Sequence, residues 1–322
     1  MTYSGRWAMA ALTAALVCLI AACNRNQRKI VAVIPKGNAD IFWQTVHAGA
    51  VKASRESGVE IVWDGPPNET DINSELQILE TMMNRHVDAI ALAPSDREAL
   101  ANTVIRASND GIPVVIYDSA IATDKYTSFV ATDNFAAGQL AGERMGQILG
   151  GNGNIIMVKT TPGGASTTAR EDGFRKIIVD KFPGIHILDE RFGKAVVATS
   201  LDVTENMLTA HPNVDGIFCS NESGTTGAMQ ALKSRGSKIK LVGFDWSPTT
   251  LAGLSSGLID SLVIQNPFKM GYESVMACVK SIRKQPVPKQ INLPPRLITR
   301  ENLNDPDVQA QVKPDLKQYL GD

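Results

Sequence analysis

Seven residues of this chain combine two kinds of chemistry that suit a polar, ring-shaped molecule. The adjacent aromatics Phe42 and Trp43 could cover the apolar C–H face of a sugar ring. The other five carry carboxylate, guanidinium or amide groups that can make paired hydrogen bonds to neighbouring hydroxyls, and they are Asp118, Arg170, Asn221, Asp245 and Gln265. This combination predicts a site for a polyhydroxylated ligand.

The seven residues share a position relative to predicted strands. Four of them come within two residues of the end of a strand-like apolar run, and three lie in the first turns of a helix that follows such a run. In open α/β sheets, ligands bind just beyond the carboxyl ends of the strands. We therefore expect all seven side chains to face one cleft.

Strands and helices alternate along the chain from about residue 29. Predicted helices cover roughly 41–57, 71–85 and 96–109, and the alternation resumes after the glycine-rich segment 150–153. The predicted strands are Lys29–Ile34, Val59–Trp63, Val87–Leu92, Pro113–Tyr117, Ser128–Ala131, Asn154–Val158, Ile185–Glu190, Val214–Cys219, Ile239–Phe244 and Ile259–Ile264. Their continuous apolar runs are typical of parallel strands buried on both faces. The pattern predicts an α/β protein with two doubly wound, Rossmann-like parallel-sheet lobes.

Signals of enzymatic chemistry are weak throughout the sequence. The segment Gly151-Asn152-Gly153 lacks the third glycine of a dinucleotide-binding fingerprint, and no phosphate-binding loop motif is present. The four histidines are far apart and have no partner four residues away. The sequence therefore predicts a protein that is not an enzyme and has neither a cofactor nor a bound metal.

The first residues predict export from the cytoplasm. An apolar run ends in Ile20-Ala21-Ala22-Cys23, which resembles the lipobox of bacterial lipoproteins. We interpret residues 1–22 as a lipoprotein signal peptide, Cys23 as the lipidated residue and 23–28 as a polar tether. An ordinary signal peptide with a chance cysteine is the alternative. The remaining thiols, Cys219 and Cys278, are expected to be buried and unpaired.

Plainer explanations of the candidate residues stay open at this stage. The aromatic pair could be ordinary packing residues in the first turn of a helix. Asp118, Asp245 and Asn221 could be helix N-caps. Arg170 could be a solvated helix residue, although a cation in the first turns opposes the helix dipole. Lys36, which follows the first strand, is interpreted as a solvated residue at the rim of the cleft.

The chain resembles a known family, and the resemblance spans about Lys29 to Asn302. Its motifs are Phe42-Trp43, Gly111-Ile112-Pro113-Val114-Val115-Ile116-Tyr117-Asp118, Ala131-Thr132-Asp133-Asn134, Ala169-Arg170-Glu171, Leu208-Thr209-Ala210-His211-Pro212, Asn221-Glu222, Leu241-Val242-Gly243-Phe244-Asp245 and Gln265-Asn266-Pro267. Together they are similar to the type I periplasmic binding proteins of sugar ABC transporters, the ribose-binding-protein group. The family's ligand positions carry over to the seven residues named above.

The resemblance implies an architecture and a set of partners. The chain should cross between the lobes three times, near Thr132, Gln265 and Ile291, and the lobes should close on the ligand by hinge bending. The N-terminal lobe would comprise 29–132 plus 266–291, and the C-terminal lobe 133–265 plus 292–322. The resemblance further implies a periplasmic, membrane-anchored monomer that delivers a carbohydrate to an ABC transporter permease.

Departures from the family pattern bear on the ligand. Ser119 stands where ribose-binding members often carry arginine, and the first loop reads Asn38-Ala39-Asp40-Ile41 instead of their Asn-Asn-Pro. The segment Phe192–Val197 has no clear counterpart of their second-lobe aromatic and arginine. These differences argue against ribose itself but not against a polar cyclic ligand.

Two other functions fit the same fold. A ligand-sensing receptor that feeds a membrane histidine kinase or chemoreceptor is the alternative that the sequence hardly separates from transport. A transcription repressor is not expected, because residues 1–28 before the first strand read as a signal peptide rather than a helix-turn-helix. The net charge of −1, from 32 basic and 33 acidic residues, also argues against nucleic-acid binding.

Overall fold

A computed structural model describes residues 28–38 and 40–321. The signal-peptide prediction for 1–22, the lipidation prediction for Cys23 and nearly all of the 23–28 tether lie outside the described residues. Within the described part, no helix is both long enough and apolar enough to span a bilayer.

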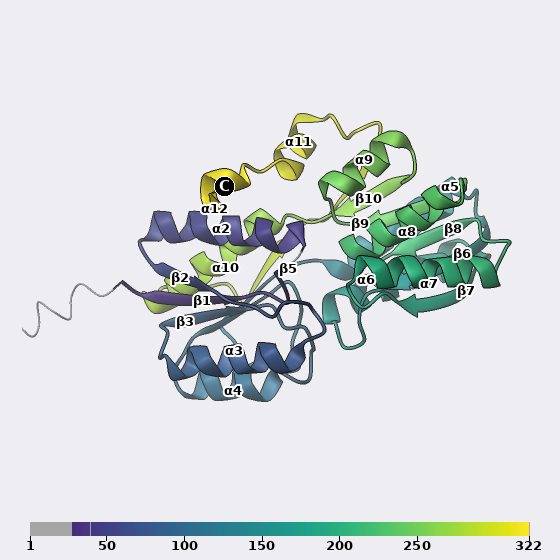
Figure 1. Ribbon diagram of the computed structural model, residues 1–322. Coiled ribbons are helices and arrows are strands. Elements are labelled where there is room, and N and C mark those ends of the chain that lie inside the picture. Colours follow the sequence, from purple (N-terminus) through teal and green to yellow (C-terminus); the bar gives the residue numbers. More distant parts are fainter. Residues whose placement is uncertain (1–27, 39, 322) are drawn as a thin grey trace, which may run out of the picture.

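Two six-stranded sheets form the two lobes seen side by side in Figure 1. The first sheet has the order β11-β5-β4-β3-β1-β2, and the second β12-β10-β9-β8-β6-β7. The first contains β1 (Ile30–Ile34), β2 (Glu60–Trp63), β3 (Ala89–Leu92), β4 (Val114–Tyr117), β5 (Ser128–Thr132) and β11 (Gln290–Leu293). The second contains β6 (Asn152–Lys159), β7 (Gly184–Phe192), β8 (Gly216–Cys219), β9 (Lys240–Phe244), β10 (Ser261–Ile264) and β12 (Arg296–Thr299).

All neighbouring strands run parallel except β12, which pairs with β10 antiparallel. The predicted fold of two doubly wound α/β lobes is therefore confirmed, and each of the ten predicted strands is present. The sequence analysis missed β11 and β12. Both are short edge strands with few buried side chains, so they lack the continuous apolar run that marks the central strands.

Helices cover both faces of each sheet (Figure 1). They are α2 (Ile41–Ser57), α3 (Ile72–Asn84), α4 (Ala101–Asn109), α5 (Asn134–Ile148), α6 (Ala165–Lys181), α7 (Val197–Ala210), α8 (Glu222–Ser234), α9 (Pro248–Ser256), α10 (Pro267–Ile282), α11 (Pro306–Val312) and α12 (Leu316–Leu320). Apolar clusters join α2 and α10 to one face of the first sheet and α3 and α4 to the other. In the second lobe, α7, α8 and α9 pack on one face, and α5 and α6 on the other.

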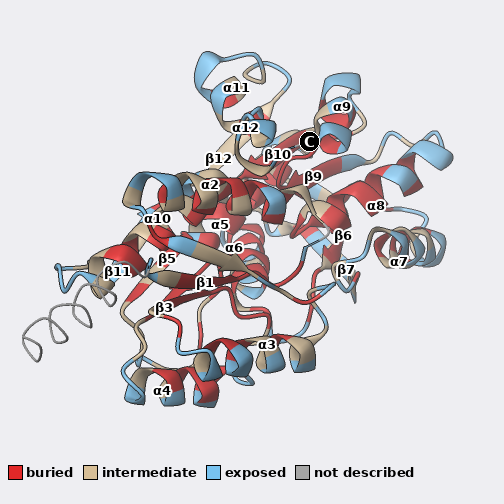
Figure 2. Cartoon of the chain, turned by 60° about the vertical axis from the view of Figure 1, so that its left-hand side comes forward, coloured by how far each residue is buried: buried red, intermediate tan, exposed pale blue. Residues whose placement is uncertain are grey.

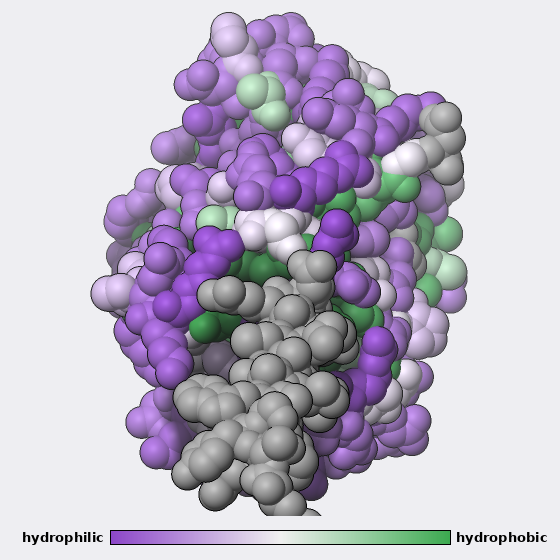
Figure 3. Space-filling model, turned by 90° about the vertical axis from the view of Figure 1, so that its left-hand side faces the viewer, coloured by the Kyte–Doolittle hydropathy of each residue, from purple (hydrophilic) through white to green (hydrophobic). Residues whose placement is uncertain are grey.

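Burial follows this layering. In Figure 2 the strands are mainly buried, whereas the outward sides of α3, α4 and α7 are exposed. Figure 3, which looks at one end of the molecule, shows an outer surface that is mostly hydrophilic where it is coloured by hydropathy. Cys219 and Cys278 are buried and unpaired, as predicted, and their burial raises the pKa of both thiols well above its usual value.

The helix predicted over 96–109 begins later than expected. Residues 97–100 form a turn rather than α-helix, and the Asp96 carboxylate caps that turn by accepting hydrogen bonds from the backbone N–H groups of Glu98 and Ala99, both at 2.8 Å. The α-helix starts only at Ala101.

The chain passes between the two sheets after β5, after β10 and between β11 and β12. The first two passages begin next to Thr132 and Gln265, but Ile291 lies inside β11 and the third passage follows that strand. The lobe boundaries 29–132 plus 266–291 and 133–265 plus 292–322 otherwise remain predictions.

The last helix, α12, does not fit this division into lobes. α12 lies against α2 of the first lobe, where the Arg55 guanidinium donates to the carbonyl oxygens of Gln318 and Tyr319 at 2.9 and 3.0 Å. The Tyr319 ring also packs near Phe268 of α10, with 5.3 Å between ring centroids. The C-terminal segment therefore spans both lobes, although the sequence analysis assigned it wholly to the second.

Candidate functional site

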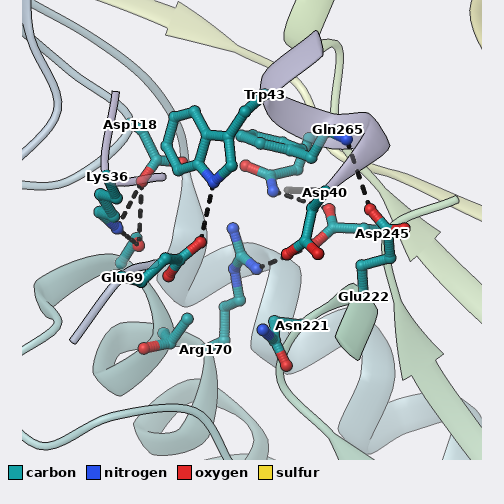
Figure 4. Close-up of a pocket in the computed structure, with 13 residues that line it drawn as sticks. Lys36, Asp40, Trp43, Glu69, Asp118, Arg170, Asn221, Glu222, Asp245 and Gln265 are labelled. Atoms are coloured by element: carbon teal, nitrogen blue, oxygen red, sulfur yellow. Dashed lines mark hydrogen bonds and ion pairs between the residues drawn. The ribbon is translucent and has the colours of Figure 1, made fainter. Parts of the chain in front are cut away.

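All seven predicted residues line one cavity between the lobes. Figure 4 labels all of them except Phe42, and the labelled side chains lie around the cavity. Four of the seven follow the carboxyl ends of strands, and the other three stand on α2 and α6. The other lining residues are Lys36, Asp40, Glu69, Ser166, Thr167 and Glu222. The expectation that strand ends would bring the seven side chains to one cleft is met; their contact with a ligand remains a prediction.

The aromatic pair stands in the first turn of α2, which follows β1 after a short loop. The rings of Phe42 and Trp43 meet edge to face, with 4.9 Å between centroids. The Trp43 indole N–H donates to a Glu69 carboxylate oxygen at 2.9 Å, so its polar edge is satisfied. This bond fixes the orientation of an apolar ring plane that lines the cavity.

Lys36 does not lie at a solvated rim, and that prediction is wrong. Its side chain is 5% exposed, and its ammonium lies 2.6 Å from the Asp118 carboxylate. It also donates to the hydroxyl oxygens of Ser119 at 2.9 Å and of Ser166 at 3.1 Å. A buried ammonium is tolerable only when its charge and its donors are all met, as they are here. Because Ser166 opens α6 of the second lobe, this bond also joins the lobes.

Arg170 is likewise buried rather than a solvated helix residue. Its guanidinium donates to Asn134 Oδ1 and to the Ser220 carbonyl oxygen, both at 2.8 Å, and lies 3.5 Å from Asp245 Oδ2. The same group lies over the Phe244 ring, 4.6 Å from its centroid. These contacts hold a cation at the start of α6 in spite of the helix dipole.

The two aspartates are not helix caps. Ser247 caps α9 after Asp245, and no helix follows directly on Asp118. Asp245 instead accepts a hydrogen bond from the Gln265 side-chain amide at 2.8 Å. Asn221 does cap α8, through a 2.9 Å bond to the Gly224 N–H, while also lining the cavity. The cap interpretation therefore holds for the asparagine only.

Sequence reasoning missed three further carboxyl groups in the cavity wall. Glu222 stands in the Asn221-Glu222 motif and Asp40 lies two residues before Phe42, and this proximity was the available signal. Glu69 comes from the loop between β2 and α3, where no strand end marks it. Burial, and then neighbouring carboxylates, raise the pKa of Asp40 to about 7 and that of Glu222 to about 9. Burial also raises the pKa of Glu69 and Asp245.

The lobes are closed over the cavity. The backbone N–H of Phe42 in the first lobe donates to a Glu222 carboxylate oxygen in the second at 3.4 Å. At the rim, the backbone N–H of Arg97 donates to the Gly163 carbonyl oxygen at 3.1 Å. Such an enclosed site, with convergent polar groups around two aromatic rings, is built to surround a small molecule.

Comparison with known proteins agrees with this geometry. Residues 31–286 match the family model of the periplasmic binding protein domain. The ribose import binding protein RbsB of Haemophilus influenzae is 28% identical over 293 residues, which cover 90% of this chain and 99% of that protein. Among described residues, no group of three or more histidine, cysteine, aspartate or glutamate side chains is arranged to hold a metal.

Solved structures give the same picture. A carbohydrate transporter solute-binding protein from Agrobacterium radiobacter, in complex with D-arabinose, has a TM-score of 0.87 and 29% identity, with coverage of 89% of this chain and 100% of its own. An ABC transporter solute-binding protein from Agrobacterium vitis with bound D-fucose has a TM-score of 0.86 and 33% identity, with coverage of 88% and 100%. The chain belongs to the periplasmic binding protein family, among its type I sugar-binding members.

Proposed function

We propose that this protein captures a monosaccharide-sized sugar or polyol between its two lobes and delivers it to an ABC importer. The observation that carries the proposal is the closed interlobe cavity, which joins an aromatic pair to carboxylate, amide and guanidinium groups. A ligand of one ring could meet the aromatic pair and the polar groups of both lobes at once.

The proposed contacts follow from the chemistry of each group. Phe42 and Trp43 offer ring surface to the C–H face of the sugar. Asp118 and Asp245 accept from its hydroxyls, while Arg170, Asn221 and Gln265 can donate to its oxygens. Both lobes therefore contribute donors or acceptors, so that ligand binding and lobe closure stabilise each other.

Family membership supports the transport role. Periplasmic binding proteins work outside the cytoplasm, and the relatives named above are import or transporter proteins rather than enzymes. Because these relatives are transport proteins, we place transport ahead of the sensory alternative, a receptor that feeds a histidine kinase or chemoreceptor. A small-molecule carbohydrate and a permease are the partners we propose, with the binding protein acting as a monomer.

A thermal-shift screen against monosaccharides, polyols and nucleosides tests the binding role. A sugar present at a hundred times its dissociation constant should stabilise the folded protein by about 2.7 kcal/mol, which a melting curve detects readily. Nucleosides are the matched comparison, because they carry a sugar joined to a base. The proposal is wrong if no sugar or polyol raises the melting temperature at millimolar concentration.

The lipid anchor on Cys23 is a separate part of the proposal. Since Ile20-Ala21-Ala22-Cys23 supplies the acylation signal, Cys23→Ser should move the protein from the membrane pellet to the soluble fraction. Cys18→Ser is the matched control, because Cys18 lies within the segment that the signal peptidase would remove. A Cys23→Ser protein that still needs detergent for release would contradict the anchor.

A further inference from the structure

The cavity holds more acidic than basic groups. Of the described residues that line it, five carry a carboxyl group and two carry a cation. The cations are already paired, Lys36 with Asp118 at 2.6 Å and Arg170 with Asp245 at 3.5 Å. The carboxyl groups of Asp40, Glu69 and Glu222 are therefore left without a cationic partner in the wall of the cavity.

The hydrogen bonds of these three groups differ. Glu69 accepts from the Trp43 indole N–H at 2.9 Å. Among the described residues, Glu222 accepts a single long bond of 3.4 Å, from the Phe42 backbone N–H. Asp40 occupies the N-cap position of α2, yet its side chain makes no capping hydrogen bond. Figure 4 shows the Asp40 and Glu222 side chains next to each other, one from each lobe, beside Asp245.

A second, independent polar group in the cavity wall has no hydrogen-bond donor. The side-chain oxygen of Gln265 is buried and has no hydrogen-bond partner among the described residues. Gln265 is 1% exposed and lines the same cavity, and its amide nitrogen is already committed to Asp245. Buried acceptors without donors are costly, so this oxygen indicates that a ligand group supplies the missing hydrogen.

The excess of carboxyl groups in the cavity wall determines which hydrogen-bond donor a ligand should bring. An ionised carboxylate in a closed cavity is costly unless it meets a cation or takes up a proton. Burial and neighbouring carboxylates raise the pKa of Asp40 to about 7 and of Glu222 to about 9, so Glu222 holds a proton in the empty site near neutral pH and Asp40 is about half protonated. A ligand ammonium would take the place of such a proton, and a neutral sugar would not.

We propose that the ligand is an amino sugar in its ammonium form, with the charged nitrogen between Asp40 and Glu222. The inference rests on the proposed sugar-binding function and narrows its ligand class. An ammonium offers three N–H donors and one positive charge. The wall offers two carboxyl groups that have no cationic partner and one amide oxygen that has no donor. The aromatic pair still covers the apolar face of the ring.

Binding of the ammonium must release a proton from the site. When Glu222 passes from carboxylic acid to carboxylate beside the ligand, one positive charge enters the cavity and one proton leaves it. The charged groups that face this position are Lys36, Asp40, Glu69 and Asp118 from the first lobe and Arg170, Glu222 and Asp245 from the second. Affinity should therefore rise from pH 5 toward pH 8 for as long as the amine stays protonated.

Calorimetric titration of the purified protein tests the inference directly. The probes are D-glucosamine, D-galactosamine and D-mannosamine, each beside its neutral parent hexose and its N-acetyl derivative. One amino sugar should bind at least tenfold more tightly than its parent, acetylation should abolish the preference, and the heat should change with the ionisation enthalpy of the buffer. Equal or tighter binding of the neutral parent overturns the inference and leaves the proposed function standing. If neither amino nor neutral sugars bind, the proposed function itself fails.

Variants of Glu222 and Asp40 test whether these two carboxyl groups cause the preference for the charged amine. Glu222→Gln keeps an oxygen that can accept from the Phe42 N–H, and it should lower the ratio of amine to parent affinity at least tenfold. Asp40→Asn should lower the same ratio, which keeps the test open if one variant folds poorly. Asp172→Asn is the matched control, an exposed carboxylate on α6 outside the cavity, and it should leave the ratio unchanged. An unaltered ratio in both cavity variants overturns the assignment.

Discussion

Asp118 and Asp245 occupy equivalent positions in the two lobes. Both have left-handed backbone conformations, with φ of 61° and 63°. Each backbone N–H donates at 2.9 Å to a neighbouring strand, Asp118 to Val130 of β5 and Asp245 to Val263 of β10. Aspartate tolerates this conformation better than most residues, yet it still costs energy. The sheet therefore holds each carboxylate at the mouth of its strand, facing the cavity from opposite sides.

Asp118→Asn should weaken sugar binding by roughly 2–4 kcal/mol, because it removes a charge-assisted acceptor and leaves the buried Lys36 ammonium without its counter-charge. Titration of the sugar identified in the thermal screen measures this loss. Asp133→Asn is the control: Asp133 is exposed and caps α5, and asparagine caps equally well. Unchanged affinity in Asp118→Asn would remove Asp118 from the site.

Close helix–helix contacts at glycine residues position the helices that line the cavity. Gly49 of α2 and Gly271 of α10 each lie against the backbone of the other helix, and a Cβ at either glycine would overlap a carbonyl oxygen. Gly138 of α5 and Gly173 of α6 repeat this arrangement in the second lobe, where the oxygen facing Gly138 belongs to Arg170. These close contacts fix the position of α2 against α10 and of α6 against α5. Trp43 is carried by α2 and Arg170 by α6.

Gly138→Ala should therefore affect both stability and binding. The added methyl group forces α5 and α6 apart, which should cost about 1–3 kcal/mol in the free energy of unfolding and displace Arg170 from its partners. Denaturant unfolding measures the first effect and ligand titration the second. Gln147→Ala changes an exposed position on the same helix and should leave both quantities nearly unaltered. A stability loss with full affinity would show that the crossing does not position the arginine.

Hydrogen bonds between the lobes hold the whole molecule closed. They include the bonds from Lys36 to Ser166, from Phe42 to Glu222 and from Arg97 to Gly163. Closure also brings Asp40 and Glu222 together, and both have raised pKa values in this arrangement. A carboxyl group whose pKa is raised favours the closed form while protonated and disfavours it once ionised. Ligand binding and pH should both act on the lobe angle.

Small-angle scattering measures the effect of ligand and pH on lobe closure. The radius of gyration of the empty protein should grow as the pH rises from 6 to 9, through the raised pKa values of about 7 for Asp40 and about 9 for Glu222. Saturating ligand should reduce it at every pH. In the double variant Asp40→Asn and Glu222→Gln the pH dependence should largely disappear. A constant radius at proven ligand saturation argues against hinge closure.

Much of this organisation follows from the sequence alone. Central parallel strands are buried on both faces, so their continuous apolar runs identify them without knowledge of their neighbours. The carboxyl ends of parallel strands meet at one edge of a sheet. That rule indicates the segments that follow the strands, and the family resemblance selects seven residues from them. All seven line one cavity, namely Phe42, Trp43, Asp118, Arg170, Asn221, Asp245 and Gln265. Local pattern and topology together determined the fold class and the location of the site.

Only the tertiary structure decided the charge state of that site. Lys36 looks like a solvated residue in sequence, and its burial depends on Ser166, which is 130 residues away and in the other lobe. Glu69 enters the cavity from a loop, and Asp40 meets Glu222 only because the lobes close. Burial and pairing of a charge are set by groups distant in sequence, and local periodicity carries no record of them. For the same reason, the sequence does not predict the contacts of α12 with α2 of the first lobe.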